Sequence, residues 1–225
     1  FSTGTTVVES TREAIEELKK RAALLWEVSL DQVEWVDGHA RLISGNEPKT
    51  MSLAQIAKQA GKTGGPIMAN CSMNVTGAGP SLGTHIVDVE VDEETGQVSI
   101  VRYTAIQDAG KAIHPAYVEG QMQGGAVQGI GWALNEEYIY NDKGELENTG
   151  FLDYRIPVCS DVPMIDTVIV EVPNPNHPYG VRGVGETPII PPLAAISNAV
   201  SRATNKRFDE LPLSPPKVLA KLMHG

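Results

Sequence analysis

The fold of this chain depends most on one apolar, glycine-rich run, Val118-Glu119-Gly120-Gln121-Met122-Gln123-Gly124-Gly125-Ala126-Val127-Gln128-Gly129-Ile130-Gly131-Trp132-Ala133-Leu134. Its apolar spacing and its lack of proline predict a helix. The run nevertheless contains five glycines, and each costs a helix interior up to ~1 kcal/mol relative to alanine. We therefore expect another helix or a ligand to approach this backbone closely.

Three glutamines in the same run, Gln121, Gln123 and Gln128, add neutral hydrogen-bonding groups. An amide side chain can pair with the edge of a heterocycle or with phosphate oxygens. Helix packing alone would account for the glycines, but it accounts less well for the glutamines. The glycine spacing matches neither G-x-G-x-x-G nor G-x-x-x-x-G-K-[ST], which argues against nicotinamide binding and nucleotide hydrolysis.

Two strands are predicted before this helix. Residues 83–91 and 98–106 carry alternating or apolar β-formers, and Glu93-Glu94-Thr95-Gly96 between them predicts the turn of a hairpin. The second strand leads into Asp108-Ala109-Gly110 and then Pro115, which favours a helix start. Asp108 would then lie at the carboxyl end of a strand, where binding sites in mixed sheets collect. The alternative is an aspartate that caps the turn.

A second glycine-rich stretch, Gly180-Val181-Arg182-Gly183-Val184-Gly185-Glu186-Thr187-Pro188, lies further along the chain, after a predicted hairpin at 138–146 and a strand at 167–172. Its glycines and proline restrict the backbone around one carboxylate, Glu186, which precedes the apolar residues 189–193. A carboxylate beside apolar neighbours is suited to act as a general base near neutral pH. The alternative is that Glu186 is a solvated turn residue or a charge at a helix start.

The chain begins with hydroxyl groups around a glycine: Ser2, Thr3, Gly4 and Thr5. Such a run can offer hydroxyl and backbone N–H donors to an anion, or it can be a frayed terminus. The capping-box pattern Ser10-Thr11-Arg12-Glu13 predicts that the first helix begins there and continues to about Val28.

The remaining elements follow from local patterns. Asp37-Gly38 predicts a hairpin between residues 33–36 and 39–43. A capping box at Ser52-Leu53-Ala54-Gln55 predicts a short helix, which Gly61 closes. Residues 62–82 are predicted to form a loop, and two further helices are predicted at residues 194–203 and 214–222.

The composition narrows the class of partner. With a net charge of −10, the chain has no basic surface for nucleic acid, and no apolar run approaches the ~20 residues needed to span a membrane. Cys71 and Cys159 lie far apart, so we expect free thiols in a reducing cytoplasm and no iron–sulfur or zinc site. The histidines lack metal-ligand spacing. Any metal would therefore arrive with a cofactor.

Five motifs stand in the order found in the xanthine dehydrogenase/aldehyde oxidase family: Asp108-Ala109-Gly110 with Pro115, Glu119-Gly120-Gln121 with Gly124 and Val127-Gln128-Gly129, Asp153-Tyr154-Arg155-Ile156-Pro157, Gly183-Val184-Gly185-Glu186-x-Pro188, and Leu211-Pro212-Leu213-Ser214-Pro215. The chain resembles the C-terminal part of the molybdenum-binding subunit of that family, and the resemblance covers nearly all of residues 1–225. It implies an α+β fold of the molybdopterin-binding type, with antiparallel hairpins packed against helices. Residues 1–225 would form one such portion, in two lobes whose boundary the sequence does not mark.

The resemblance also implies molybdenum hydroxylase chemistry. In that family the glutamate matched by Glu186 removes the proton from a water-derived hydroxide during hydroxylation of an N-heterocycle or an aldehyde. The implied cofactor is molybdenum-molybdopterin, in its cytosine dinucleotide form. The residues implied to lie against that cofactor are Ser2, Thr3, Gly4, Thr5, Gln121, Gly124 and Gly185.

The resemblance further implies partners, because the family's molybdenum subunit is several times longer. We expect the remaining molybdenum-subunit segment to complete the pocket for a small-molecule substrate, with [2Fe–2S] and FAD on other subunits. Phe1 would follow a cut or an engineered start, or the chain would be the smaller half of a split subunit. Apolar surface left by absent neighbours would then favour association. Two alternatives are a catalytically silent interface fragment and a hydrolase that uses Glu186 and Asp108.

Overall fold

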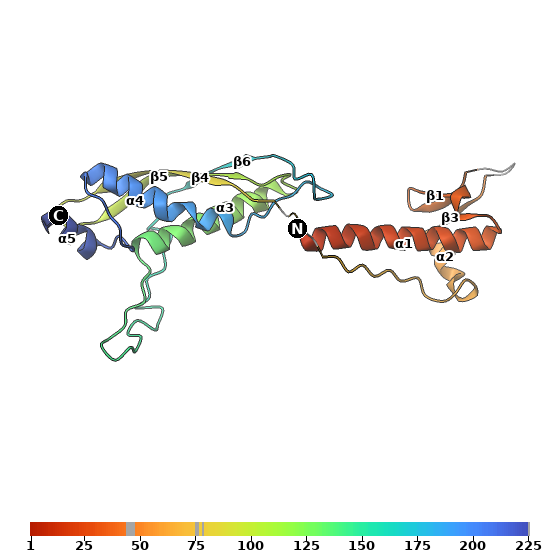
Figure 1. Cartoon of the computed structure of the whole chain (residues 1–225), viewed down its shortest axis with the longest axis horizontal. Coiled ribbons are helices and arrows are strands. Elements are labelled where there is room, and N and C mark those ends of the chain that lie inside the picture. Colours follow the sequence, from red (N-terminus) through yellow and green to blue (C-terminus); the bar gives the residue numbers. More distant parts are fainter. Residues whose placement is uncertain (44–47, 75–76, 78, 225) are drawn as a thin grey trace. The chain divides into compact units, whose positions relative to one another are not determined.

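The computed structural model describes residues 1–43, 48–74, 77 and 79–224. The chain forms two compact units, Phe1–Gly77 and Ala78–Gly225, and Figure 1 shows the elements of each. Residues 75, 76 and 78 of the predicted loop at 62–82 lie outside the described residues. The described rest of that loop contains neither helix nor strand apart from Lys62, the last residue of a 3-10 turn at Ala60–Lys62.

The first unit is a long helix with a small sheet and a short helix packed on it. Its elements are α1 (Ser2–Trp26), η1 (Leu30–Gln32), β1 (Val33–Val36), β2 (His39–Leu42), β3 (Thr50–Ser52), α2 (Leu53–Lys58) and η2 (Ala60–Lys62). The strands are antiparallel in the order β1-β2-β3. Leu18, Ala22, Val33, Ala40 and Ile56 form its buried core.

The hairpin and the second capping box of this unit are confirmed. β1 and β2 pair around Asp37 and Gly38, which both have positive φ, and Ser52 makes both hydrogen bonds of a capping box with Gln55. The predicted start of the first helix is wrong, because α1 begins at Ser2 and the Ser10 hydroxyl donates to the Val7 carbonyl at 3.1 Å.

The hydroxyl run is therefore helical. The Thr5 hydroxyl donates to the Phe1 carbonyl at 3.2 Å, and the Thr6 hydroxyl donates to the Ser2 carbonyl at 2.9 Å. These bonds satisfy the two hydroxyl groups inside α1, whereas the sequence suggested that the hydroxyl run would precede the helix.

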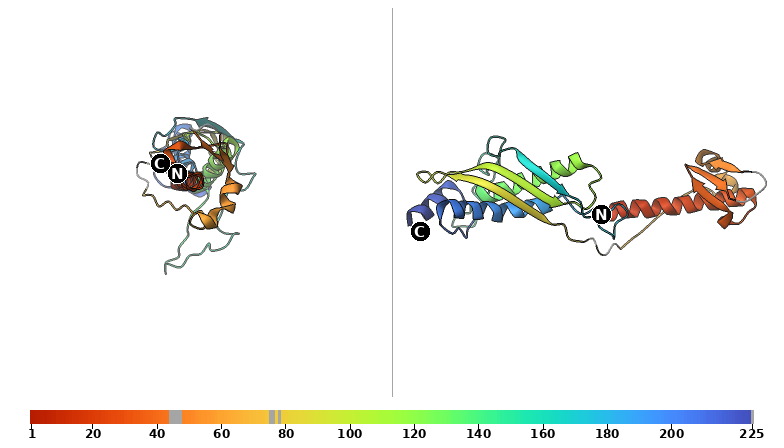
Figure 2. Two further views of the ribbon diagram at one scale, coloured as in Figure 1. Left: turned by 90° about the vertical axis from the view of Figure 1, so that its right-hand side faces the viewer. Right: turned by 90° about the horizontal axis from the view of Figure 1, so that it is seen from above.

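The second unit consists of a three-stranded sheet and four helical segments. They are β4 (Gly83–Val91), β5 (Val98–Asp108), α3 (Pro115–Leu134), β6 (Ile165–Val170), η3 (Thr187–Ile189), α4 (Pro191–Thr204) and α5 (Pro215–His224). β4 and β5 form the predicted antiparallel hairpin, whereas β6 lies parallel to β5 and begins two residues before the predicted strand. Figure 2 shows the strands running along α3 and α4.

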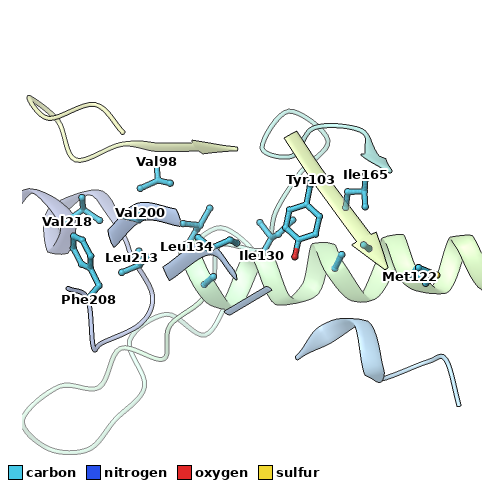
Figure 3. Close-up of a cluster of buried hydrophobic side chains, with 14 of the residues drawn as sticks. Val98, Tyr103, Met122, Ile130, Leu134, Ile165, Val200, Phe208, Leu213 and Val218 are labelled. Atoms are coloured by element: carbon cyan, nitrogen blue, oxygen red, sulfur yellow. The ribbon is translucent and has the colours of Figure 1, made fainter. Parts of the chain in front are cut away.

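The core of the second unit fills the space between the sheet and these helices. Figure 3 shows Tyr103, Ile165 and Met122 at one end of this core, and Val200, Phe208, Leu213 and Val218 toward the other. Alternate residues of β5 point into it, because successive side chains of a strand face opposite sides. The mixture of helices and sheet confirms the predicted α+β fold.

Two glycines of α3 explain its unusual composition. A Cβ on Gly125 would lie 2.5 Å from Pro188 Cγ, and a Cβ on Gly129 would lie 2.6 Å from the Ile189 carbonyl oxygen. The predicted close approach is thus made by the segment that follows Glu186. At Gly120 and Gly124, by contrast, a Cβ would meet no described atom within 4 Å.

The segment between α3 and β6 carries exposed apolar side chains. Tyr140 and Leu146 pair as an isolated antiparallel bridge, which confirms the predicted hairpin there. Phe151 is 98% exposed and Leu152 is 91% exposed. Within the described residues, no helix combines the length and the apolar character needed to cross a membrane.

Candidate functional site

The end of β5 crosses the segment that leads to Glu186. Gly110 and Val181 form an antiparallel bridge, the Lys111 N–H donates to the Gly180 carbonyl at 2.8 Å, and the Arg182 N–H donates to the Ala109 carbonyl at 3.0 Å. Gly110 has a φ of 64°, and a Cβ there would lie 2.3 Å from the Gly180 carbonyl oxygen. Only glycine fits this crossing without displacing the second segment.

Asp108 has a structural role at this crossing. Its Oδ1 accepts hydrogen bonds from the Gly110 N–H at 2.9 Å and from the Val172 N–H at 3.1 Å. Its Oδ2 lies 3.1 Å from Nε of Arg182, and both side chains are largely buried. The turn-capping interpretation of Asp108 is therefore the better one, and the carboxylate pair required by the hydrolase hypothesis loses one member.

Residues 183–186 form what we call the glutamate loop, which runs directly into η3. The Glu186 side chain is exposed, and it makes no hydrogen bond or ion pair with the described part of the chain. The Glu186 carbonyl accepts a hydrogen bond from the Ile189 N–H at 3.2 Å, so its backbone is fixed. The described residues therefore fix the backbone of Glu186 and leave its carboxylate exposed.

Gln121 lies beside the glutamate loop. Its Nε2 would be 3.4 Å from a Cβ built on Gly185, so the amide reaches the residue before Glu186. Gly124 lies one turn further along α3, exposed and with open space where a Cβ would be. The structure thus brings together Gln121, Gly124, Gly185 and Glu186, all in the second unit.

Ser2, Thr3, Gly4 and Thr5 belong to the first unit, where they form the first turn of α1. The Ser2 and Thr3 side chains are exposed, and Phe1 provides no side-chain cap for this helix. The first N–H groups of a helix have no intrahelical partner, and they attract anions. This geometry is suited to a phosphate group.

The second unit has two pockets of interest, and one of them borders a predicted site residue. A pocket of about 200 Å³ borders Gln121 and is lined mainly by apolar side chains, among them Val118, Val181 and Val184. A larger pocket of about 590 Å³ is lined by Ile100, Leu134, Arg155 and Pro163, and contains none of the predicted site residues. Within the described ranges, no cluster of three His, Cys, Asp or Glu side chains is placed to hold a metal ion.

One residue near the site was missed by the sequence analysis. Gln107 lies next to Asp108 in β5, its side chain is buried, and its Nε2 donates to the Gly183 carbonyl at 3.3 Å. A pattern in the sequence could have drawn attention to it, because alternation from Tyr103 through Ala105 places Gln107 on the core face of the strand.

The residues present suit the implied cofactor in two respects. Gly124 leaves space on an exposed helix face, and the Gln121 amide is exposed beside it. A flat heterocycle needs both a close backbone approach and in-plane hydrogen-bonding partners. In the first unit, considered by itself, the exposed first turn of α1 offers donors suited to a phosphate.

Comparison with known proteins identifies the family. A family model described as "Molybdopterin cofactor-binding domain" matches residues 1–163. The chain is 37% identical over 207 residues to a putative xanthine dehydrogenase molybdenum-binding subunit, XdhA, of Escherichia coli K12, a match that covers 90% of this chain and 28% of the relative. The chain therefore spans less than a third of the length of that relative.

Two solved structures have the same fold. Quinoline 2-oxidoreductase from Pseudomonas putida 86 matches with a TM-score of 0.73 and 31% identity, over 93% of this chain and 28% of that one. A Cu,Mo-CO dehydrogenase matches with a TM-score of 0.80 over 97% of this chain and 28% of that one, at 24% identity, which shows the fold alone. The chain belongs to the molybdopterin cofactor-binding domain family, and it is similar to the molybdenum-binding subunits of xanthine dehydrogenases.

Proposed function

We propose that this chain supplies one wall of the cofactor site and the general base of a molybdenum-dependent oxidoreductase. The reaction is hydroxylation of an N-heterocycle or an aldehyde, with water as the source of oxygen. The observation that carries the proposal is the placement of the Gln121 amide, whose Nε2 would lie 3.4 Å from a Cβ on Gly185, so that an exposed hydrogen-bonding group lies beside the backbone that carries Glu186.

The bound molybdenum cofactor supplies the redox chemistry. Within this chain, the Glu186 carboxylate accepts the proton of the attacking water-derived group, which raises its nucleophilicity. Gln121 offers its amide to the cofactor, and Gly124 and Gly185 allow the backbone to approach it. In the first unit, the Ser2 and Thr3 hydroxyls and the N–H groups of Ser2, Thr3 and Gly4 bind the cofactor's phosphate, and Thr5 shapes this turn, because its hydroxyl and N–H both donate to the Phe1 carbonyl.

The activity requires further protein. A base that works near neutral pH usually needs a less solvated surrounding than an exposed side chain has. The remaining molybdenum-subunit segment provides that enclosure and the substrate pocket, while iron–sulfur and FAD subunits carry electrons away. We place the assembly in the cytoplasm, where the free thiols of Cys71 and Cys159 stay reduced.

Analysis of the natively assembled protein for molybdenum and pterin tests this proposal. We expect one molybdenum and one pterin for each copy of this chain, with cytidine monophosphate released on acid hydrolysis. An assembled protein without molybdenum and pterin would contradict the proposal. Molybdopterin without cytidine monophosphate would contradict only the dinucleotide form.

A second candidate function is that of a catalytically silent interface fragment. It is favoured by the exposure of Glu186 and by the apolar surface at Phe151 and Leu152. Such surface is typical of a protein–protein contact. Binding of pterin by the isolated chain, seen as its full absorbance after gel filtration, would argue against a purely structural role.

A further inference from the structure

We propose that Gln107 is a positioning residue, which orients the glutamate loop through the carbonyl group of Gly183. This inference rests on the proposed function of Glu186. It concerns a residue of β5 that contacts the loop from the core side, and that has no place among the residues implied by the family resemblance.

The contact is made by a fully buried side chain. Gln107 is 1% exposed, and its Nε2 donates to the Gly183 carbonyl at 3.3 Å and to the Ser81 hydroxyl at 3.4 Å. Gly183 precedes Glu186 by three residues, within the glutamate loop. The amide therefore fixes the direction of a peptide group close to the base.

Stability does not explain why an amide is buried at this position. Gln107 Oε1 is buried and has no hydrogen-bond partner within the described residues. Burying an acceptor without a partner is unfavourable, and an apolar side chain of similar size would avoid that penalty. Residues that lower stability in this way are typical of functional sites.

The glutamate loop has few other constraints. Main-chain hydrogen bonds tie Gly180 and Arg182 to the end of β5, and the Asp108–Arg182 ion pair adds a side-chain tie on the opposite face of the strand. Beyond Arg182, Val184 packs against the core, whereas Gly183 and Gly185 have no side chains with which to pack. Among the described residues, Gln107 provides the side-chain hydrogen bond to a carbonyl of this loop, that of Gly183.

The test is Gln107→Met in the assembled protein, which keeps the volume and removes the amide. We expect an unchanged or higher unfolding temperature and an unchanged molybdenum and pterin content. Hydrogen exchange of the Arg182 and Ile189 amides, which donate to main-chain carbonyls at the two ends of the glutamate loop, should become at least tenfold faster. The kcat should fall at least tenfold while KM stays within twofold, because the base is displaced and substrate binding is not.

Gln123→Met is the matched control. Gln123 is half-buried, and its Nε2 also donates to a main-chain carbonyl at 3.3 Å, that of Ile165 in β6. Loss of this bond should leave the kcat and the exchange of the Arg182 and Ile189 amides within twofold of the unaltered protein. A general effect of removing a glutamine would affect both variants alike.

Several results would overturn the proposal. Unchanged exchange and unchanged kcat in Gln107→Met would show that the amide does not orient the loop. Failure of both Gln107→Met and Gln107→Leu to fold would assign Gln107 a purely structural role. The exchange measurement does not require a cofactor. An error in the proposed function would instead appear as absent molybdenum in the unaltered protein. Failure of this inference can therefore be distinguished from failure of the proposed function.

Discussion

Nε of Arg182 lies 3.1 Å from Oδ2 of Asp108, and this ion pair ties the segment leading to Glu186 to the end of β5. The side chains of Arg182 and Asp108 are only 14% and 12% exposed. Removing one member of a buried pair leaves the other charge without compensation. The position of the glutamate loop therefore depends on an interaction that a single substitution can break.

Asp108→Asn should lower the free energy of unfolding of this chain by about 3 kcal/mol, because it leaves the Arg182 guanidinium buried beside a neutral group. Urea unfolding measures this change. The control is Asp166→Asn, which removes an exposed partner of Arg102 at 3.6 Å and should cost less than about 1 kcal/mol. Equal losses in the two variants would show that the Asp108–Arg182 pair has no special role.

Gly129→Ala should destabilise the chain, because a Cβ there would lie 2.6 Å from the Ile189 carbonyl oxygen, a main-chain atom that cannot rotate away. We expect a loss of about 1–3 kcal/mol, which is usual for overpacking. At Gly120 the space is open, so Gly120→Ala should be neutral or stabilising by up to ~1 kcal/mol. Thermal unfolding of both variants makes the comparison, and a stable Gly129→Ala chain would contradict the packing described.

Gly124→Ala separates cofactor binding from folding. The site is open in the described chain, so alanine should leave the stability unchanged or higher. If the cofactor lies against this helix face, the added methyl group will lower the molybdenum and pterin content of the assembled protein several-fold. Gly120→Ala is the control and should retain full content. Full cofactor content in Gly124→Ala would remove Gly124 from the proposed site.

The stability of the second unit should depend on pH through His85. Burial lowers the pKa of His85 from its ordinary 6.5 to about 4. Between these values the unfolded chain binds a proton that the folded chain does not, so stability rises with pH and falls on acidification from 6.5 toward 4. The full effect is up to about 3 kcal/mol.

The pH effect is measured by urea unfolding at several pH values between 4 and 7. His85→Phe keeps an aromatic ring beside Tyr103, whose ring centroid lies 5.4 Å away, but it cannot titrate. The difference between the two stability profiles should therefore grow on acidification. Parallel profiles would show that His85 titrates normally in the folded chain.

Local sequence patterns predicted most of the fold. Asp37-Gly38 defined a hairpin because its backbone needs positive φ, and the glycines of α3 indicated a close approach that Pro188 and Ile189 make. The start of α1 was predicted wrongly because Ser10 stands in a pattern typical of a helix cap. A serine hydroxyl can also donate to a carbonyl one turn earlier inside a helix, as Ser10 does to Val7. The parallel pairing of β6 depends on contacts far apart in sequence, which local patterns do not contain.

The candidate site was predictable only in part. The motifs named Gln121, Gly185 and Glu186, and the structure places the Gln121 amide nitrogen 3.4 Å from where a Cβ on Gly185 would be. Gln107 was missed because a single polar residue on a strand has no motif; its importance follows from burial and from its bond to Gly183. The sequence left open whether Glu186 is solvated, because apolar neighbours in sequence need not enclose a side chain in space; within the described residues the side chain is exposed.

The central claim is that Glu186 is the general base, and Glu186→Gln in the assembled protein tests it most directly. The amide keeps the size and the hydrogen-bonding shape of the side chain but cannot accept the proton. We expect full molybdenum and pterin content and a kcat lowered by about 100- to 10,000-fold. Glu90→Gln, at an exposed position of β4, is the control and should retain normal turnover. Near-normal turnover in Glu186→Gln with the cofactor bound would contradict the proposed role.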